Sequence, residues 1–247
     1  MKPPIIALLY LTASSSVLSG IDNPYKQLKA PSYKDRQEAA IYIVRHPELI
    51  SVEKLPALLE AVEASLNEPN QELAETLLQM LGEAHWIILS KSPNAVQDAS
   101  TDFKRKLLTV CKKAALKSNI KFKRYAYPLL GLYSDGIPVE EFLVERYTAE
   151  PPEVEAFILE GLAYSGGHLD ETIALLNKAA SSSNAELTRH ILTGASWSKS
   201  KKLFPIVLSS LSQENPNLQN SAIVAILKYG NTAKEFIPEM KEVLRMR

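Results

Sequence analysis

Apolar residues recur every three or four positions along most of the chain from Lys34 to Arg247. This spacing is the period of amphipathic α-helices, and short runs containing Asn, Pro, Ser or Gly separate the helical stretches. Pro205 and Pro238 each follow a bulky apolar residue near the start of such a stretch, 33 positions apart. A proline in the first turn of a helix removes no intrahelical hydrogen bond. Its return at the same place predicts a repeated structural unit.

One helix of the unit is expected in five stretches that align with one another: 70–82, 119–133, 151–164, 184–197 and 215–229. Each stretch opens on Asn or Pro, which favours a helix cap or a first turn. Their first anchoring apolar residues are Leu73, Phe122, Val154, Leu187 and Leu218, so the last three intervals are 32, 33 and 31 residues and the first is 49. We interpret the excess, at residues 85–101, as an insertion or an extended connection.

A second helix is expected after each of these stretches and before the first of them, at 51–66, 103–117, 138–150, 168–180, 201–213 and 232–246. Pro56, Pro205 and Pro238 then lie in the first turns of second helices. A period of 31–33 residues with two helices per unit is typical of a helical solenoid.

The segments AILKYG, NTA and KEFIPEMKEVL together resemble a HEAT or HEAT-like (armadillo-type) repeat, and LTGASWSKSKKLFPIVLSSL is a weaker copy. The resemblance covers most of residues 34–247 and implies an all-α fold, a right-handed α–α superhelix (solenoid) of about six HEAT-like helix pairs. It implies a non-enzymatic scaffold that binds another macromolecule along its curved surface. We expect the second helices to form most of the concave surface, and the last helix to present a polar outer face as a cap.

At one aligned position the units carry small residues, and at another they carry aromatic residues. Gly161, Gly194 and Ala225 share a position where a small side chain would let a neighbouring helix approach closely. Aromatic residues end the first helices, at Tyr133, Tyr164, Trp197 and Tyr229. They could form a ladder for sugars or bases. The alternative, which we favour, is that each holds an inter-helix turn against the core.

The first nineteen residues differ from the rest, with Lys2 near the terminus, an apolar run from Ile5 to Ala13 and no acidic residue. This pattern predicts a signal peptide over 1–19, cut between Ser19 and Gly20, and a secreted or periplasmic protein. The apolar run is too short to span a membrane. An N-terminal helix packed on the body is the alternative. Residues 20–33 then form a linker, and the solenoid occupies 34–247.

Candidate chemistry is sparse. The net charge is zero, Cys111 is the one cysteine, and the four histidines do not have metal-ligand spacing, so we expect no metal, no cofactor and no catalytic residues. Some HEAT-like proteins are DNA glycosylases or bilin lyases, and an enzyme of that kind is the alternative function. A glycosylase could recruit Trp197, Asp135 and the basic segment 104–124.

That basic segment is the strongest binding signal. It contains nine basic residues and no acidic one: Lys104, Arg105, Lys106, Lys112, Lys113, Lys117, Lys121, Lys123 and Arg124. Ten acidic residues lie in 35–83 and seven in 140–160, so a solenoid would place a positive slab between two negative ones. The slab could bind a polyanion, or it could be a solvated face neutralised by its neighbours. We expect a protein partner first and an acidic polymer second; export would disfavour nucleic acid.

Overall fold

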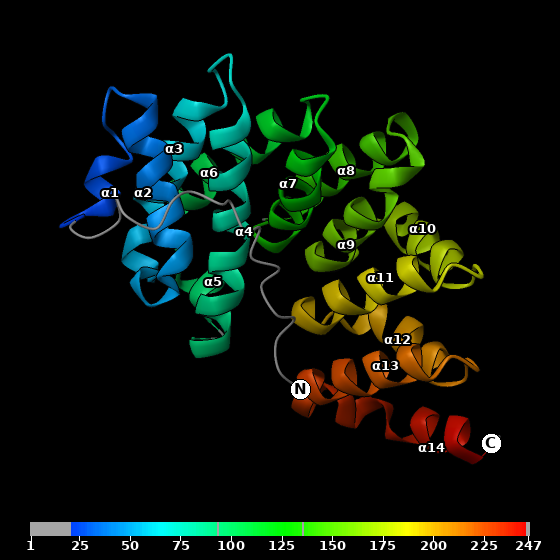
Figure 1. The fold of residues 1–247 in the computed structure, drawn as a ribbon. Helices are drawn as coiled ribbons and strands as arrows, with labels where there is room; N and C mark the ends of the chain where they lie inside the picture. Colours follow the sequence, from blue (N-terminus) through cyan, green and yellow to red (C-terminus); the bar gives the residue numbers. More distant parts are fainter. Residues whose placement is uncertain (1–20, 93, 135, 246–247) are drawn as a thin grey trace.

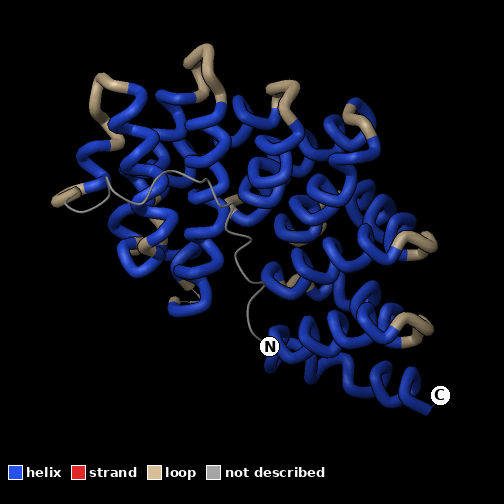
Figure 2. The backbone as a smooth tube through the Cα atoms, in the orientation of Figure 1, coloured by secondary structure: helices blue, strands red, loops and turns tan. Residues whose placement is uncertain are grey.

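The computed structural model describes residues 21–92, 94–134 and 136–245, which form two layers of helices along a curved arc (Figure 1). These residues contain no strand, and short loops follow one another along the outer edge of the arc (Figure 2). None of their helices is long and apolar enough to cross a membrane. The expected fold class, an all-α right-handed superhelix of helix pairs, is confirmed.

Within the described ranges the helices form six pairs, each with an outer and an inner member, followed by a last outer helix. The outer helices are α1 (Pro24–Gln27), α3 (Leu55–Ser65), α6 (Thr101–Ala115), α8 (Ile137–Ala149), α10 (Asp170–Ala180), α12 (Phe204–Leu211) and α14 (Ile237–Arg245). The inner helices are α2 (Tyr33–Arg45), α4 (Glu72–Lys91), α7 (Ile120–Leu132), α9 (Glu155–Ser165), α11 (Ala185–Ser198) and α13 (Pro216–Tyr229). The short helix α5 (Ala95–Asp98) links α4 to α6. One or two 3₁₀ turns precede several outer or inner helices: η1 (Pro47–Leu49), η2 (Val52–Lys54), η3 (Pro152–Val154), η4 (Lys201–Leu203) and η5 (Gly230–Phe236).

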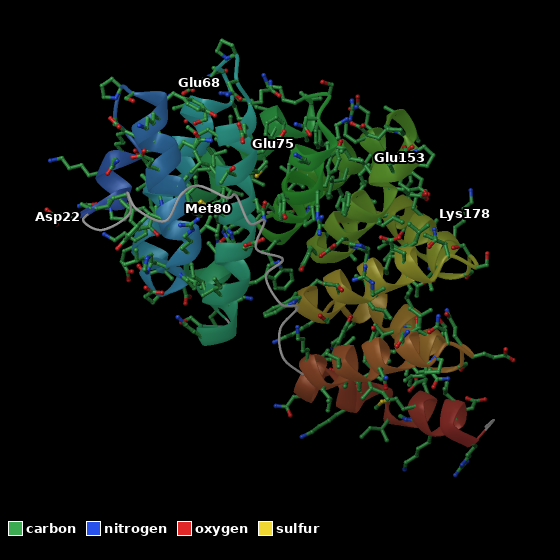
Figure 3. All side chains as sticks on the ribbon, in the orientation of Figure 1. Asp22, Glu68, Glu75, Met80, Glu153 and Lys178 are labelled. Atoms are coloured by element: carbon green, nitrogen blue, oxygen red, sulfur yellow. The ribbon has the colours of Figure 1, made fainter. Side chains whose placement is uncertain are left out.

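The helix starts follow the local chemistry that the sequence indicates. Asn184 and Asn215 cap α11 and α13, and each side-chain oxygen accepts a hydrogen bond at 3.0 Å from the backbone N–H two residues later. Pro56 and Pro205 lie in the first turn of α3 and α12, as expected. Polar side chains such as Glu153 and Lys178 project from the outer edge of the arc (Figure 3).

The expected phase of the repeat is wrong by half a unit. Each outer helix packs more extensively on the inner helix that follows it than on the one before, so α12 pairs with α13 rather than with α11. The expectation that the second helices form the concave surface is not supported either. The helices aligned as first helices, α4, α7, α9 and α11, pack on one another more extensively than the second helices do, and their C-terminal ends reach the hollow of the arc (Figure 1).

Glycine determines which layer is on the inside. A Cβ added at Gly161 would lie 2.5 Å from the carbonyl oxygen of Tyr127, and one at Gly194 would lie 2.6 Å from that of Glu160. Backbones of α7, α9 and α11 thus approach one another more closely than helices with side chains between them can. Successive outer helices pack on one another less extensively than α7, α9 and α11 do. A two-layer stack bends toward its more closely spaced layer, so α7, α9 and α11 lie on the concave side.

The insertion expected at 85–101 is largely helical. α4 continues through His85 and Trp86 to Lys91, and α5 then leads into α6. The extension makes α4 the longest inner helix, at 20 residues. It projects toward the concave side of the arc rather than forming a loop outside it (Figure 1).

The N-terminal part of the expected linker packs on the solenoid. α1 forms one helical turn beginning at Pro24, and both Tyr25 and Leu28 are buried in the core. The Tyr25 hydroxyl donates a hydrogen bond to the carbonyl of Leu49 at 3.2 Å. The predicted signal peptide, 1–19, lies outside the described residues.

We expect Gly161→Ala to lower the free energy of unfolding by about 2 kcal/mol, because the new Cβ meets backbone that cannot move without shifting α7. Gly82→Ala is the matched control. Its Cβ would lie 2.6 Å from a side-chain atom of Tyr125, which can rotate, so the loss should be small. Urea denaturation followed by circular dichroism measures both. Equal losses would contradict a backbone contact between the inner helices.

Candidate binding site on the concave face

A cavity of about 550 Å³ lies where the C-terminal ends of the inner helices α4, α7, α9 and α11 meet the start of α6 and η4. This volume is within the range of small-ligand and side-chain binding pockets. The cavity arises from the fold because several inner helices end at the same edge of the solenoid. The turns that follow them bring backbone, serine and lysine side chains to one place.

Three aromatic side chains meet beside the cavity although they are far apart in the sequence. The ring of Trp86 lies 6.1 Å from that of Tyr164 and 5.5 Å from that of Trp197, centroid to centroid. Trp86 belongs to the extension of α4, and α7 and α9 lie between α4 and α11 in the inner layer. The contact therefore crosses the concave face. Trp86 remains 40% exposed, which leaves an aromatic surface open to a ligand.

A lysine of the next inner helix, α13, lies against this aromatic cluster. The Lys228 ammonium lies 3.9 Å from the centre of the Trp197 ring, within the range of a cation–π interaction. Burial and the nearby charge of Lys199 lower the pKa of Lys228. The Trp197 indole N–H is buried and has no hydrogen-bond partner among the described residues.

The cavity has a positive lining. Lys104, Lys201 and Lys202 contribute to it, and none of the lining residues that the structure describes is Asp or Glu. Lys201 pairs with Glu235 at 2.6 Å. The ammonium groups of Lys104 and Lys202 donate to the backbone carbonyls of Gln97 and His168, at 3.0 and 3.2 Å. Two of the three lysines thus keep a positive charge available to an anion.

A buried carboxylate fixes the turn that forms one wall of the cavity. Gly166 and Gly167 take left-handed backbone conformations after α9, with φ of 97° and 68°. Glu140 of α8 is fully buried beneath this turn and accepts hydrogen bonds from the N–H groups of His168 and Leu169, at 2.8 and 2.9 Å. Burial alone would raise the pKa of Glu140, but these bonds and that from Ser165 outweigh it and hold the pKa below its ordinary value.

The nine basic residues expected as one positive slab are distributed among different neighbours. Several of them pair with acidic residues of adjacent units. Lys106 and Lys113 reach Glu63 of α3 at 3.6 and 3.3 Å. Lys121 reaches Glu75 of α4 at 2.9 Å. These contacts correspond to the alternative expectation, a face neutralised by its neighbours.

The remaining basic residues are also spread out. Lys123 is nearly buried and bonds to Glu150, which also accepts from Tyr127 and Arg146 at 2.7 Å. Arg105 pairs with Asp102 at 3.4 Å on its own helix. Lys112 lies over Phe142 and Arg124 over Tyr125, and Lys117 is partly buried. Of the nine, only Lys104 lines the cavity. Whether the others bind a ligand stays a prediction.

Of the aromatic residues at the ends of the inner helices, Tyr133, Tyr164 and Tyr229 are buried and Trp197 is partly buried. Tyr133 packs edge-on against Phe103, at 5.9 Å between ring centroids. Tyr229 packs against Phe204, and its hydroxyl donates to the carbonyl of Ser200 at 2.8 Å. These two hold their turns against the core, as the favoured interpretation predicts. Trp197 differs from these tyrosines because it also lines the cavity.

The residues considered for a glycosylase come together only in part. Trp197 and Lys104 both line the cavity, whereas most of the basic segment lies elsewhere and Asp135 is outside the described residues. Within the described ranges, no group of three or more His, Cys, Asp or Glu residues could hold a metal ion.

Sequence reasoning missed two parts of the site. Trp86 lies within residues 85–101, which the repeat predicts only as an insertion or connection, so the sequence does not indicate its place at the cavity. Lys201 and Lys202 lie in the turn before α12, three to four residues ahead of Pro205, and the repeat indicates this position at a turn.

Comparison with known proteins supports the fold. No family model matches this sequence, and no curated protein matches it. An engineered protein solved by the Northeast Structural Genomics Consortium is 17% identical, with a TM-score of 0.51 over 85% of this chain and 96% of that chain. This likeness supports the fold seen in the structure, a solenoid of helix pairs.

Two further solved structures are similar to smaller degrees. A designed armadillo repeat protein is 13% identical over 84% of this chain and 98% of that one, with a TM-score of 0.49. A second engineered protein from the same consortium is 16% identical over 90% of this chain and 72% of that one, with a TM-score of 0.36. At such identities the likeness concerns the fold alone.

We expect Glu140→Gln to destabilise the solenoid by about 2 kcal/mol at neutral pH, because a charged acceptor of buried N–H groups is lost. The pKa of Glu140 is depressed in the folded protein, so its contribution is complete above the ordinary value of 4.5 and is lost as the pH falls below it. Urea midpoints of the two proteins should therefore converge at acidic pH. A difference that does not change with pH would contradict the assignment.

Proposed function

We propose that this chain is a non-enzymatic scaffold, acting after export, that binds an acidic segment of another protein on its concave face. The observation that carries the proposal is the cavity lined by Lys104, Lys201, Lys202 and Trp197, with no carboxylate among its described lining residues. A carboxylate side chain placed there would meet ammonium groups, and a neighbouring aromatic or apolar side chain would meet Trp86 and Trp197.

The shape of the molecule favours a polypeptide as the ligand. Repeats follow one another along the arc on both sides of the helices that line the cavity (Figure 1), so an extended segment could contact several repeats while one acidic side chain enters the cavity. The cavity is one anchor within a longer surface. The ammonium groups of Lys104 and Lys202 donate hydrogen bonds to backbone carbonyls. These bonds hold both charges beside the cavity before a ligand binds.

Binding of fluorescein-labelled peptides tests this proposal. We expect peptides that alternate Glu with Tyr to bind, peptides with Lys in place of Glu not to bind, and affinity to fall as salt is added. Lys104→Glu/Lys202→Glu should weaken binding of the acidic peptides by about tenfold or more, equivalent to 1.4 kcal/mol.

The matched control is Lys178→Glu/Lys241→Glu, which makes the same charge change at exposed positions outside the cavity. It should leave the peptide affinity within about twofold of the wild type. Equal binding of Lys-containing peptides, or equal losses in both double variants, would contradict the proposed site.

Export has its own test. We expect the protein purified from its native host to begin near Gly20 and to be found outside the cytoplasm, because residues 1–19 have the charge, apolar run and small residues of a signal peptide. Intact mass and N-terminal sequencing of each cell fraction measure this. A cytoplasmic chain that begins at Met1 would contradict export and leave the peptide-binding proposal unaffected.

A further inference from the structure

The wall of the cavity beside Gly166 brings together polar groups from two separate turns. A Cβ added at Gly166 would lie 3.8 Å from Nε2 of His168 and 4.0 Å from the hydroxyl oxygen of Ser200. Both are ordinary contact distances, so the missing side chain of Gly166 leaves room for a ligand atom that touches both residues. All three residues line the cavity.

The hydroxyl of Ser200 is free to bind a ligand. Ser200 directly precedes η4, a position at which a serine side chain usually accepts a hydrogen bond from a backbone N–H group. Ser32 and Ser100 do so at the starts of α2 and α6, at 3.4 and 3.2 Å. Ser200 makes no such bond, and its hydroxyl has no partner among the residues that the structure describes.

Two lysines bring positive charge to the same cavity. The Lys202 ammonium donates to the carbonyl of His168 at 3.2 Å, and that of Lys104 donates to the carbonyl of Gln97 at 3.0 Å. A carbonyl is uncharged, so neither bond neutralises its lysine, and each ammonium keeps further N–H groups to donate. Within the described ranges neither lysine forms a salt bridge.

The carboxylates closest to this wall in the chain are engaged or lie outside the cavity. Glu140 is buried beneath the turn and accepts hydrogen bonds from its backbone N–H groups. Glu235 is paired with Lys201. Asp170 and Glu171 are exposed in the first turn of α10, and neither lines the cavity. An anion beside Gly166 therefore meets donors rather than carboxylates among the described lining residues.

We propose that His168, Ser200 and Lys202 bind a phosphoryl group, so that the segment held on the concave face carries a phosphorylated side chain. A phosphate monoester has three terminal oxygens and nearly two negative charges at neutral pH. It can accept from an imidazole, a hydroxyl and an ammonium together, whereas a carboxylate has two oxygens and one charge. The polypeptide nature of the ligand rests on the proposed function; the phosphoryl group rests on this cluster of donors.

Three labelled peptides test the inference. Each alternates Glu with Tyr, and its central position holds phosphoserine, Glu or Ser. Fluorescence anisotropy should show the phosphoserine peptide binding at least about tenfold more tightly than the Glu peptide, and the Ser peptide binding least tightly. Equal affinities for phosphoserine and Glu would overturn the inference and leave the proposed function standing. If no peptide binds, both are contradicted.

Ser200→Ala distinguishes a phosphoryl site from attraction by charge alone, because it removes one hydroxyl and no charge. We expect the ratio of the affinities for the phosphoserine and Glu peptides to fall by about threefold or more. Ser181→Ala is the matched control, since Ser181 is exposed at the end of α10 and does not line the cavity. An unchanged ratio in Ser200→Ala, or equal falls in the two variants, would overturn the assignment.

Inorganic phosphate checks the same site without a phosphorylated peptide. We expect phosphate to displace the Glu peptide at a lower concentration than acetate does at matched ionic strength, because acetate has one charge and two oxygens. This advantage should be smaller in Ser200→Ala than in the wild type. Equal displacement by the two anions would contradict a site selective for phosphoryl groups.

Discussion

The close backbone contact between inner helices is the constraint on which the rest of the structure depends. At Gly161 and Gly194 the helix surface is backbone, and the neighbouring carbonyl oxygens occupy the space where a Cβ would be. This contact shortens the inner layer relative to the outer one, so the stack bends. The bend brings the extension of α4 over the ends of α9 and α11, where Trp86 meets Trp197. Without it the aromatic cluster and the cavity would be parts of separate repeats.

Ion pairs between successive units are the second organising interaction. Glu63 pairs with Lys106 and Lys113, and Glu75 with Lys121, across the junctions between repeats. Exposed pairs of this kind contribute little free energy individually, but they cancel the charge of the basic segment locally. Glu150 is a buried exception. Burial would raise its pKa, but bonds from Lys123, Tyr127 and Arg146 hold it below its ordinary value. Of the nine basic residues of the segment, Lys104 alone lines the cavity, whereas Lys112, Lys117 and Arg124 lie elsewhere.

The sequence was sufficient for the repeat and its helices because both arise from local chemistry. Asn caps and first-turn prolines act within a few residues, and the 3.6-residue period of apolar side chains is readable without knowing the neighbours. The buried tyrosines at the helix ends could be predicted for the same reason. The position of Gly161 and Gly194 even indicated where helices would approach one another, although not which layer this would place on the inside.

Only the tertiary structure decided the phase of the repeat, the direction of the curve and the composition of the site. A two-helix period is the same whichever helix is counted first. The period alone therefore could not show that α12 pairs with α13. The lysines of 104–124 look alike in the sequence, yet Lys104 lines the cavity and Lys113 faces Glu63. Trp86 and Trp197 are more than one hundred residues apart, and nothing local couples them. The sequence alone determined the repeat, the helices and their caps, because these depend on residues close together in the chain. The structure decided which distant residues meet at the site, because curvature accumulates over several repeats.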